Sequence, residues 1–409
     1  MRKTNSPKWV FTSRFRANAY SWKASKLACR RIQEAVSEIK KATRQDPELG
    51  AEGSIRFMEK LWPALQHVDS SSGTLGTAVY NAMEVLVDVV IKAPADEKTR
   101  LKWLKRLWDA FNEDGVGFLD KLGEHWGEVC GSAQTASRWA DELLPIVHRC
   151  WEETRSGTYS YFSGTGACLS CLISSGRHQE LLDLLELAPH ISWHYRKYGV
   201  QALVGMGKKG EAIKYAKASC GLNDSQIAID LACEKILLSS GLYEEAYQLY
   251  ALMVNRGGTN LATFRSIVKK YPMKDPHEIL QDLIESMPGE EGKWFATAKS
   301  QGLLPLALKL AHQSPCEPKT LNRAARDYHE KNPKFALGVA IASLHWLAEG
   351  WGYEVTGSDV FAAYDFAMKA AESLDVADQV KADIVKIVSS DNSPGMYVRN
   401  ILGHHLDIG

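Results

Sequence analysis

The chain has 409 residues, and its 49 Lys and Arg side chains balance its 49 Asp and Glu side chains, so the formal net charge is zero. Hydrophobic residues make up 45% of the chain and charged residues 24%, as in ordinary folded proteins. This composition excludes a collagen, a disulfide scaffold and a wholly disordered chain. The length allows about two or three domains, or one elongated array.

The N-terminal segment is strongly basic. Residues 1–45 hold twelve Lys and Arg against Glu34 and Glu38, a net charge of +10, so the rest of the chain carries −10. The hydrophobic spacing predicts one long helix over residues 14–45 and further helices over 47–68 and 74–93. Aromatic residues are interleaved with the cations: Trp9, Phe11, Phe15, Tyr20 and Trp22.

Three interpretations of this segment are open. Cations mixed with aromatic residues bind phosphates and stack on bases. Alternatively, the positive helix docks on the acidic remainder of its own chain with its aromatics in the core, or it binds an acidic protein partner. The candidate nucleic-acid-binding residues are Arg14, Arg16, Lys23, Lys26, Arg30 and Arg31.

Targeting signals are weak. Residues 1–33 carry nine Lys and Arg and no acid, which is also the pattern of a transit peptide, although the segment continues into the helical pattern without a break. No apolar core of a secretory signal follows, and no run of 18 apolar residues predicts a transmembrane helix. The eight cysteines are widely spaced, so we expect a reducing, cytoplasmic compartment and no membrane partner.

Proline and polar residues indicate where helices begin. Proline is favoured at the first helical position, where we place Pro47, Pro94, Pro189, Pro276, Pro318 and Pro333. Asp46, Asp275 and Asn332 precede three of them as candidate N-caps. Residues 96–152 form a Trp-rich helical set. The hydroxyl-rich residues 70–74 open a helix, either as a capping loop or as an anion or ligand site.

The middle of the chain contains a repeat with a period of about 30–34 residues, typical of stacked helix hairpins. Four segments superpose on a glycine: Gly176-Arg-His-Gln-Glu-Leu, Gly207-Lys-Lys-Gly-Glu-Ala, Gly241-Leu-Tyr-Glu-Glu-Ala and Gly302-Leu-Leu-Pro-Leu-Ala. Each has a large residue three positions after the last residue quoted, namely Leu184, Tyr215, Leu249 and Leu310. A further unit at Asp275 lacks the glycine. We expect the glycine to end the first helix or to allow a close approach.

This stretch, about residues 158–345, resembles tetratricopeptide-type (TPR-like) repeats, although the usual aromatic and closing proline are not regular. Longer segments resemble an uncharacterised bacterial family of all-helical proteins, for which no activity is known. They are residues 69–79, 288–296 and 314–327. The resemblances imply an all-α fold and no particular chemistry.

The predicted fold is therefore all-α, with an N-terminal helical bundle followed by a TPR-like right-handed α-solenoid of helix hairpins. We assign residues 1–155 to the bundle with its long basic first helix, 156–350 to the repeat array and 351–409 to C-terminal helices that cap it.

No motif predicts a catalytic residue, a metal site or a cofactor. Cys168 and Cys171 are the only CxxC pair, and a helical context favours core cysteines over a zinc or redox site. Residues 288–294 faintly resemble a phosphate-binding loop but have the wrong glycine spacing and lack its hydroxyl and its preceding strand, so an inter-helix turn is favoured. His404 and His405 are adjacent and therefore poorly placed to share one ion.

Two cationic groups on predicted helices are candidate partner-binding residues, although packing in the core is an alternative for the Trp: Trp193, His194, Arg196 and Lys197, and Lys319, Arg323 and Arg326. Exposed Arg, Trp and Tyr commonly anchor interfaces. We therefore expect a non-enzymatic scaffold or adaptor that binds a protein or peptide in the groove of the array. The alternatives are nucleic-acid binding through residues 1–45 and an enzyme with a site at the junction of bundle and array, near residues 70–74.

Overall fold

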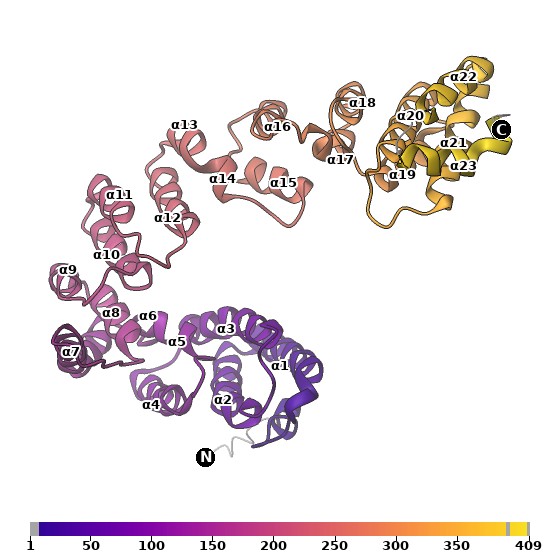
Figure 1. The fold of residues 1–409 in the computed structure, drawn as a ribbon. Coiled ribbons are helices and arrows are strands. Elements are labelled where there is room, and N and C mark those ends of the chain that lie inside the picture. The colour runs from indigo at the N-terminus through magenta and orange to yellow at the C-terminus, as the bar shows by residue number, and fades with distance from the viewer. Residues whose placement is uncertain (1–7, 390–392, 407–409) are drawn as a thin grey trace. The chain divides into compact units, whose positions relative to one another are not determined.

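In the computed structural model the described residues are 8–389 and 393–406. Every regular element in these two ranges is helical, and neither range contains a strand (Figure 1). The predicted all-α class is confirmed. Contacts divide the chain into two compact units, Met1–Ile236 and Leu237–Gly409. The division at residues 155 and 350 stays a prediction, as does the right-handed twist of the array.

The first unit consists of helices packed around one continuous core. Its helices are α1 (Ser25–Gln45), α2 (Pro47–Leu65), α3 (Thr74–Lys92), α4 (Glu97–Glu113), α5 (Asp120–Glu124), α6 (Trp126–Val129), α7 (Ala133–Arg155), α8 (Thr165–Ser174), α9 (His178–Glu186), α10 (Trp193–Gly205) and α11 (Lys209–Lys217). Helices α1, α2 and α3 pack against one another, and α8 contacts α5, α6, α7, α9 and α10. The core runs without interruption from Phe11 to Ala202. The boundary between the units falls within α12 (Gln226–Leu238).

The predicted long first helix begins later than expected. Residues 14–24 are not part of α1, and only two short 3-10 turns, η1 (Val10–Ser13) and η2 (Trp22–Ala24), precede it. Asn18 adopts a left-handed conformation with φ of 59°. The rings of Phe11 and Phe15 lie 5.7 and 5.0 Å from that of Phe57 on α2. The predicted helix over residues 14–45 is therefore wrong for residues 14–24, where burial of aromatic rings against α2 determines the path of the chain instead.

Most of the predicted helix starts are correct. Pro47, Pro276, Pro318 and Pro333 each open a helix. The side chains of Asp46, Asp275 and Asn332 accept backbone N–H groups in the first turn, as N-caps do. The expectation was wrong for Pro94 and Pro189, which lie in connections. Asp96 caps α4 by accepting the N–H of Thr99 at 2.7 Å, and α10 begins only at Trp193.

One described helix, Thr74–Lys92 (α3), is long and apolar enough to cross a membrane by length and composition alone. No such helix was expected from the sequence. Core helices satisfy the same test, and α3 packs against α1 and α2 with Leu75, Met83 and Leu86 fully buried.

The Trp-rich segment is helical, as predicted, and forms the centre of the first unit. The rings of Trp108, Trp126 and Trp139, from α4, α6 and α7, lie 5.0–5.1 Å apart in all three pairings. Trp108 also stacks on Phe111 at 5.4 Å. Tilted and edge-to-face aromatic pairs add to the free energy gained from burial alone, so this cluster joins the short helix α6 to α4 and α7.

The repeat glycines share one conformation. Gly176, Gly207, Gly241 and Gly302 have φ between 75° and 77°, and a Cβ added to any of them would meet no atom within 4 Å. In each repeat, the backbone N–H of the glycine donates to the carbonyl three residues before it, and the N–H of the following residue donates to the carbonyl five residues before that residue. The donor–acceptor distances are 2.8–3.1 Å. This is the Schellman ending of a helix. The glycines therefore end the first helix of each hairpin, and they do not serve a close approach.

The same ending recurs outside the predicted repeat. Gly157, Gly350 and Asp375 also have positive φ and the same pair of backbone hydrogen bonds. The unit at Asp275 lacks this ending, as predicted: α15 stops at Lys270, and Asp275 caps α16.

The second unit is also helical in its described part. It contains α13 (Tyr243–Ala246), the π-helical turn η3 (Tyr247–Ala251), α14 (Leu252–Val254), α15 (Asn260–Lys270), α16 (Pro276–Glu285), the 3-10 turn η4 (Glu291–Trp294), α17 (Phe295–Ser300), α18 (Leu304–Gln313), α19 (Pro318–Tyr328), α20 (Pro333–Ala348), α21 (Gly357–Glu372), α22 (Ala377–Val388) and α23 (Ser393–Leu406). The most extensive contacts are those of α20 with α19 and α21.

The third hairpin departs from the sequence pattern. Ala212, Ala246 and Ala307, which follow the repeat glycines, are fully buried. Leu249 was aligned with Leu184 and Leu310 but is 50% exposed, whereas Tyr250 is buried. The π-helical turn explains the difference, because it inserts one residue into the helix and rotates the following side chains.

We expect Gly207→Ala and Gly210→Ala to change stability in opposite directions. Gly207 occupies a left-handed position, so a Cβ there should destabilise the first unit by about 1 kcal/mol. Gly210 lies within α11 with open space around it, so alanine should stabilise by about 0.5–1 kcal/mol. Urea unfolding followed by circular dichroism measures both. Equal changes in the free energy of unfolding from the two substitutions would contradict the conclusion that Gly207 ends a helix.

Candidate functional site

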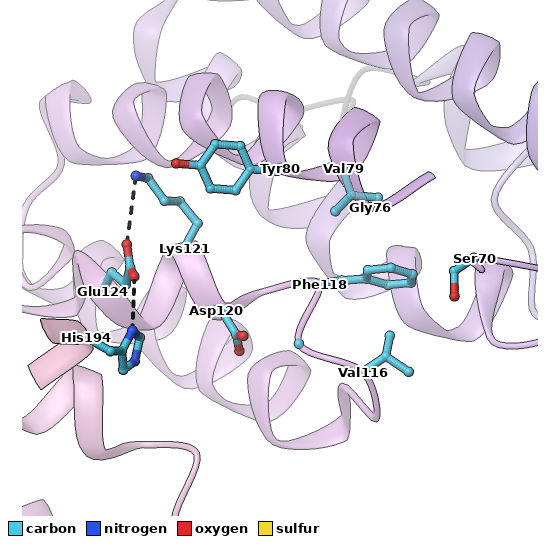
Figure 2. Close-up of a pocket in the computed structure, with 11 residues that line it drawn as sticks. Ser70, Gly76, Val79, Tyr80, Val116, Phe118, Asp120, Lys121, Glu124 and His194 are labelled. Atoms are coloured by element: carbon cyan, nitrogen blue, oxygen red, sulfur yellow. Dashed lines mark ion pairs between the residues drawn. The ribbon is translucent and has the colours of Figure 1, made fainter. Parts of the chain in front are cut away.

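A cleft in the first unit lies between α3, the connection 114–119, α5 and the start of α10, and it has a volume of about 510 Å³ (Figure 2). Figure 2 shows aromatic side chains on one side of the cleft and charged side chains at its end near α10. Its lining residues are Ser70, Gly76, Val79, Tyr80, Val116, Gly117, Phe118, Asp120, Lys121, Glu124 and His194. It therefore contains one residue of the hydroxyl-rich loop and one of the predicted partner-binding residues.

The connection that forms one wall is organised by a carboxylate. The two oxygens of Asp114 accept the N–H groups of Leu119 at 2.6 Å and Val116 at 3.2 Å. Gly117 has φ of 77°, and a Cβ there would lie 2.6 Å from an oxygen of Asp120. The left-handed backbone therefore favours glycine at this position, and a Cβ there would also displace the side chain of Asp120.

Glu124 is held by lysines at the end of the cleft. Its Oε1 accepts Lys197 Nζ at 2.6 Å, and Lys121 Nζ lies 3.8 Å from Oε2. Burial alone would raise the pKa of Glu124, but the hydrogen bond from Lys197 and the nearby positive charges outweigh it and hold that pKa below its usual value. Glu124 is thus a neutralised structural anion that joins α5 to α10.

Asp120 has no such partner. In the described part of the chain it makes no ion pair, although it lines the same cleft. Partial burial, together with the charges of Asp114 and Glu124, raises its pKa above the usual value for aspartate. A cation placed beside this carboxylate would relieve the repulsion from its neighbours.

His194 completes the charged end of the cleft. Its Nδ1 lies 3.9 Å from Glu124 Oε1. Burial and the charge of Lys197 lower its pKa, so the imidazole is neutral at pH 7. Among the described residues no hydroxyl or thiol is hydrogen-bonded to it, and covalent catalysis needs such a nucleophile–base pair. The geometry therefore offers no assembled nucleophile.

Exposed aromatic and apolar side chains border the cleft. Tyr80 is 52% exposed and Val116 is 57% exposed. Tyr159 and Tyr161, in the connection after α7, are 84% and 67% exposed but are not among the lining residues. Burial and the negative charge of Asp120 raise the pKa of Tyr161.

The predicted partner-binding residues of α10 mostly have partners within the first unit. The backbone N–H of Trp193 donates to the carboxylate of Asp224 at 2.6 Å. Arg196 donates to Glu186 at 2.8 Å and to the Tyr215 hydroxyl at 2.7 Å. The ammonium group of Lys197 is paired with the carboxylate of Glu124. Of the four, only His194 lines the cleft.

The predicted residues of α19 lie in the second unit. Lys319 Nζ donates to the carbonyls of Tyr353 and Glu354 at 3.0 and 2.8 Å. Arg323 donates within its own helix, to Lys319 O and the Thr320 hydroxyl. Arg326 pairs with its neighbour Asp327 at 2.9 Å. Their role in partner binding stays a prediction.

The weaker motifs have structural explanations. Cys168 and Cys171 are buried in α8, and burial raises the pKa of Cys168 to about 12. Residues 288–294 connect α16 to α17, as expected for an inter-helix turn. His404 and His405 lie on α23, exposed, while Asp407 is outside the described residues. No group of three or more metal-ligating side chains gathers within residues 8–389 and 393–406.

Sequence reasoning identified only the edges of the cleft. It selected residues 70–74 and His194, but not Tyr80, Asp120, Lys121 or Glu124. The run Asp114-Gly-Val-Gly117 was not singled out, although its glycines could have indicated a tight connection. Nothing in it indicates that two distant segments meet there.

No protein-family model matches this chain. No curated protein is significantly similar to it either. Among the solved structures that match is a "circular tandem repeat protein with novel repeat topology and enhanced subunit contact surfaces", at 14% identity over 93% of this chain and 83% of the other, with a TM-score of 0.15. A likeness at that TM-score supports no inference about function. The site must therefore be interpreted from its own geometry.

We expect Lys197→Met to destabilise the first unit by about 1–3 kcal/mol at neutral pH, because Glu124 would lose its closest cation. The pKa of Glu124 is lower in the folded protein than in the unfolded chain. Its ion pair therefore stabilises the fold fully at a pH above the pKa of the unfolded chain, and this stabilisation is lost as the pH falls through the pKa of the folded protein. The difference between wild type and variant should therefore shrink below about pH 4.

Urea unfolding across a pH series measures this difference. The double variant Lys197→Met/Glu124→Gln serves as the control, since removing both charges should recover part of the loss. A pH-independent difference would contradict the ion-pair explanation.

Proposed function

We propose that this protein is a non-enzymatic interaction module whose first-unit cleft binds a short segment of a partner protein carrying a Lys or Arg side chain. The observation that carries the proposal is the unpaired carboxylate of Asp120, surrounded by exposed aromatic and apolar side chains. The proposal also agrees with the adaptor function expected from the helical repeats.

The lining supports a partner of mixed character. Tyr80, Val116 and Phe118 present apolar surface, and tyrosine is frequent among the residues that dominate binding energy. Asp120 supplies one fixed negative charge, whereas Glu124 is already neutralised by Lys197. A cationic side chain next to an aliphatic or aromatic residue matches both features, because the stem of Lys or Arg packs on apolar surface while its charged head meets a carboxylate.

The direct test is selection of peptides on the intact protein. Random short peptides displayed on phage should be enriched for Lys or Arg adjacent to an aliphatic or aromatic residue. Binding of a selected peptide should fall about tenfold with Asp120→Asn, since a partly desolvated ion pair would be lost. The matched control is Asp109→Asn, which changes an exposed, unpaired aspartate on α4 outside the cleft. Enrichment of peptides without a cation, or equal loss in both variants, would refute the proposal.

We also expect peptide binding to weaken as pH falls from 7 toward 5. Asp120 has a raised pKa, so it takes up a proton at a higher pH than an ordinary aspartate. The pKa of His194 is lowered from the ordinary 6.5 of histidine, so its imidazole becomes positively charged only below that pH. The charged imidazole then repels a cationic ligand. Titration calorimetry of one peptide at several pH values measures the effect. Asp120→Asn should have a flatter pH profile, and an unchanged profile would show that another group is responsible.

A further inference from the structure

The exposed face of α1 carries basic residues towards both of its ends, with the uncharged Gln33 and Ser37 exposed between them. Five cations recur along it at Lys26, Arg30, Lys40, Lys41 and Arg44, all of them exposed. At 3.6 residues per turn they fall within an arc of about 100°. The buried residues of α1, namely Ala28, Ile32, Ala35 and Ile39, lie on the opposite side of the helix. The cations therefore form one stripe about 27 Å long, at 1.5 Å per residue.

The acidic residues of this segment do not neutralise the stripe. Glu34 is shared by Arg14, Arg30 and Arg31. Glu38 accepts the backbone N–H groups of Val10 and Phe11 at 2.7 and 3.1 Å, so its carboxylate holds the first turn in place.

Most of the cations have no acidic partner. Within the described residues, Lys26, Lys40, Lys41 and Arg44 make no ion pair, and neither do Arg16 and Lys23, which precede α1. The segment docks on its own unit through Phe11, Phe15 and Tyr20, all buried. Apolar packing, not charge pairing with the acidic remainder, therefore attaches it, and its positive charge stays available to a ligand.

One exposed aromatic residue stands at the N-terminal end of the stripe. Trp22 lies in η2, directly before α1, and is 64% exposed. Its carbonyl accepts the N–H of Asp69 at 3.0 Å, so its backbone is anchored while its indole faces solvent. An exposed indole next to a row of cations provides a surface on which an unpaired base can stack.

We propose that the outer face of α1, together with Trp22, binds single-stranded nucleic acid, with phosphates along the cations and a base stacked on the indole. The proposal is independent of the peptide cleft. An anionic membrane fits less well, because an amphipathic helix inserts through its apolar face and that face of α1 is buried in the bundle. An acidic peptide would pair with the cations, but it would not explain the exposed indole of Trp22 beside them.

The test measures binding of the full-length protein to a fluorescein-labelled oligothymidylate of about 20 nucleotides by fluorescence anisotropy. If about five phosphates are contacted, log K should fall with log salt with a slope of about −3.5. A duplex of equal length should bind more weakly, because its bases are not free to stack. Binding that does not depend on salt, or binding to phosphatidylserine vesicles without binding to the oligonucleotide, would overturn the proposal.

Charge reversal locates the surface. Lys26→Glu/Lys40→Glu/Arg44→Glu should weaken binding by about tenfold or more and flatten the salt dependence. The control is Lys235→Glu/Lys309→Glu/Lys331→Glu, three exposed lysines without ion pairs on other parts of the chain, which changes the net charge equally. Circular dichroism verifies that both variants fold. Equal losses would show a general charge effect and contradict a site on α1.

Trp22 separates stacking from electrostatics. Trp22→Ala should lower the affinity by about fivefold or more while leaving the salt slope unchanged, and Trp22→Phe should restore part of it. If Trp22→Ala binds as tightly as wild type, single-strand recognition through the indole is wrong.

Discussion

The ion pair between Lys197 and Glu124 determines the character of the cleft. Because Lys197, with support from Lys121, neutralises Glu124, this carboxylate joins α5 to α10 and gains little from any further cation. Asp120 lies four residues earlier on α5 and has no cation of its own, so the only unsatisfied negative charge of the site is placed among exposed aromatic side chains. Without the pair, two neighbouring carboxylates would repel each other and the start of α10 would lose its anchor.

Apolar docking has a comparable effect on the N-terminal segment. The rings of Phe11 and Phe15 pack against Phe57, which attaches a segment of high positive charge without using that charge. The acids Glu34 and Glu38 are occupied within the segment itself. A net charge of zero for the whole chain is therefore compatible with a strongly positive surface on α1, since within residues 8–389 and 393–406 no acidic side chain from elsewhere in the chain pairs with it.

Much of the fold followed from local rules. The N-caps at Asp46, Asp275 and Asn332 depend on a few adjacent residues, so the sequence predicted them correctly. For the repeat glycines it left two roles open, and their left-handed conformation shows that they end helices. The errors arose where tertiary contacts override local pattern. Residues 14–24 have a helical spacing but bend to bury aromatics, and the π-helical turn moves Tyr250 into the place expected for Leu249. Only the periphery of the cleft was predicted, because its residues come from three separate segments, at 70–80, 116–124 and 194.

By itself the sequence determined the helical class, the helix endings and the concentration of positive charge in the first 45 residues. These depend on backbone conformation and composition, which neighbouring residues control. Only the tertiary structure decided which carboxylate remains unpaired, which cations face solvent, and which predicted partner-binding residues already have partners. Pairing and burial depend on which helices pack together, and that packing reflects the sum of many weak contacts between distant parts of the chain.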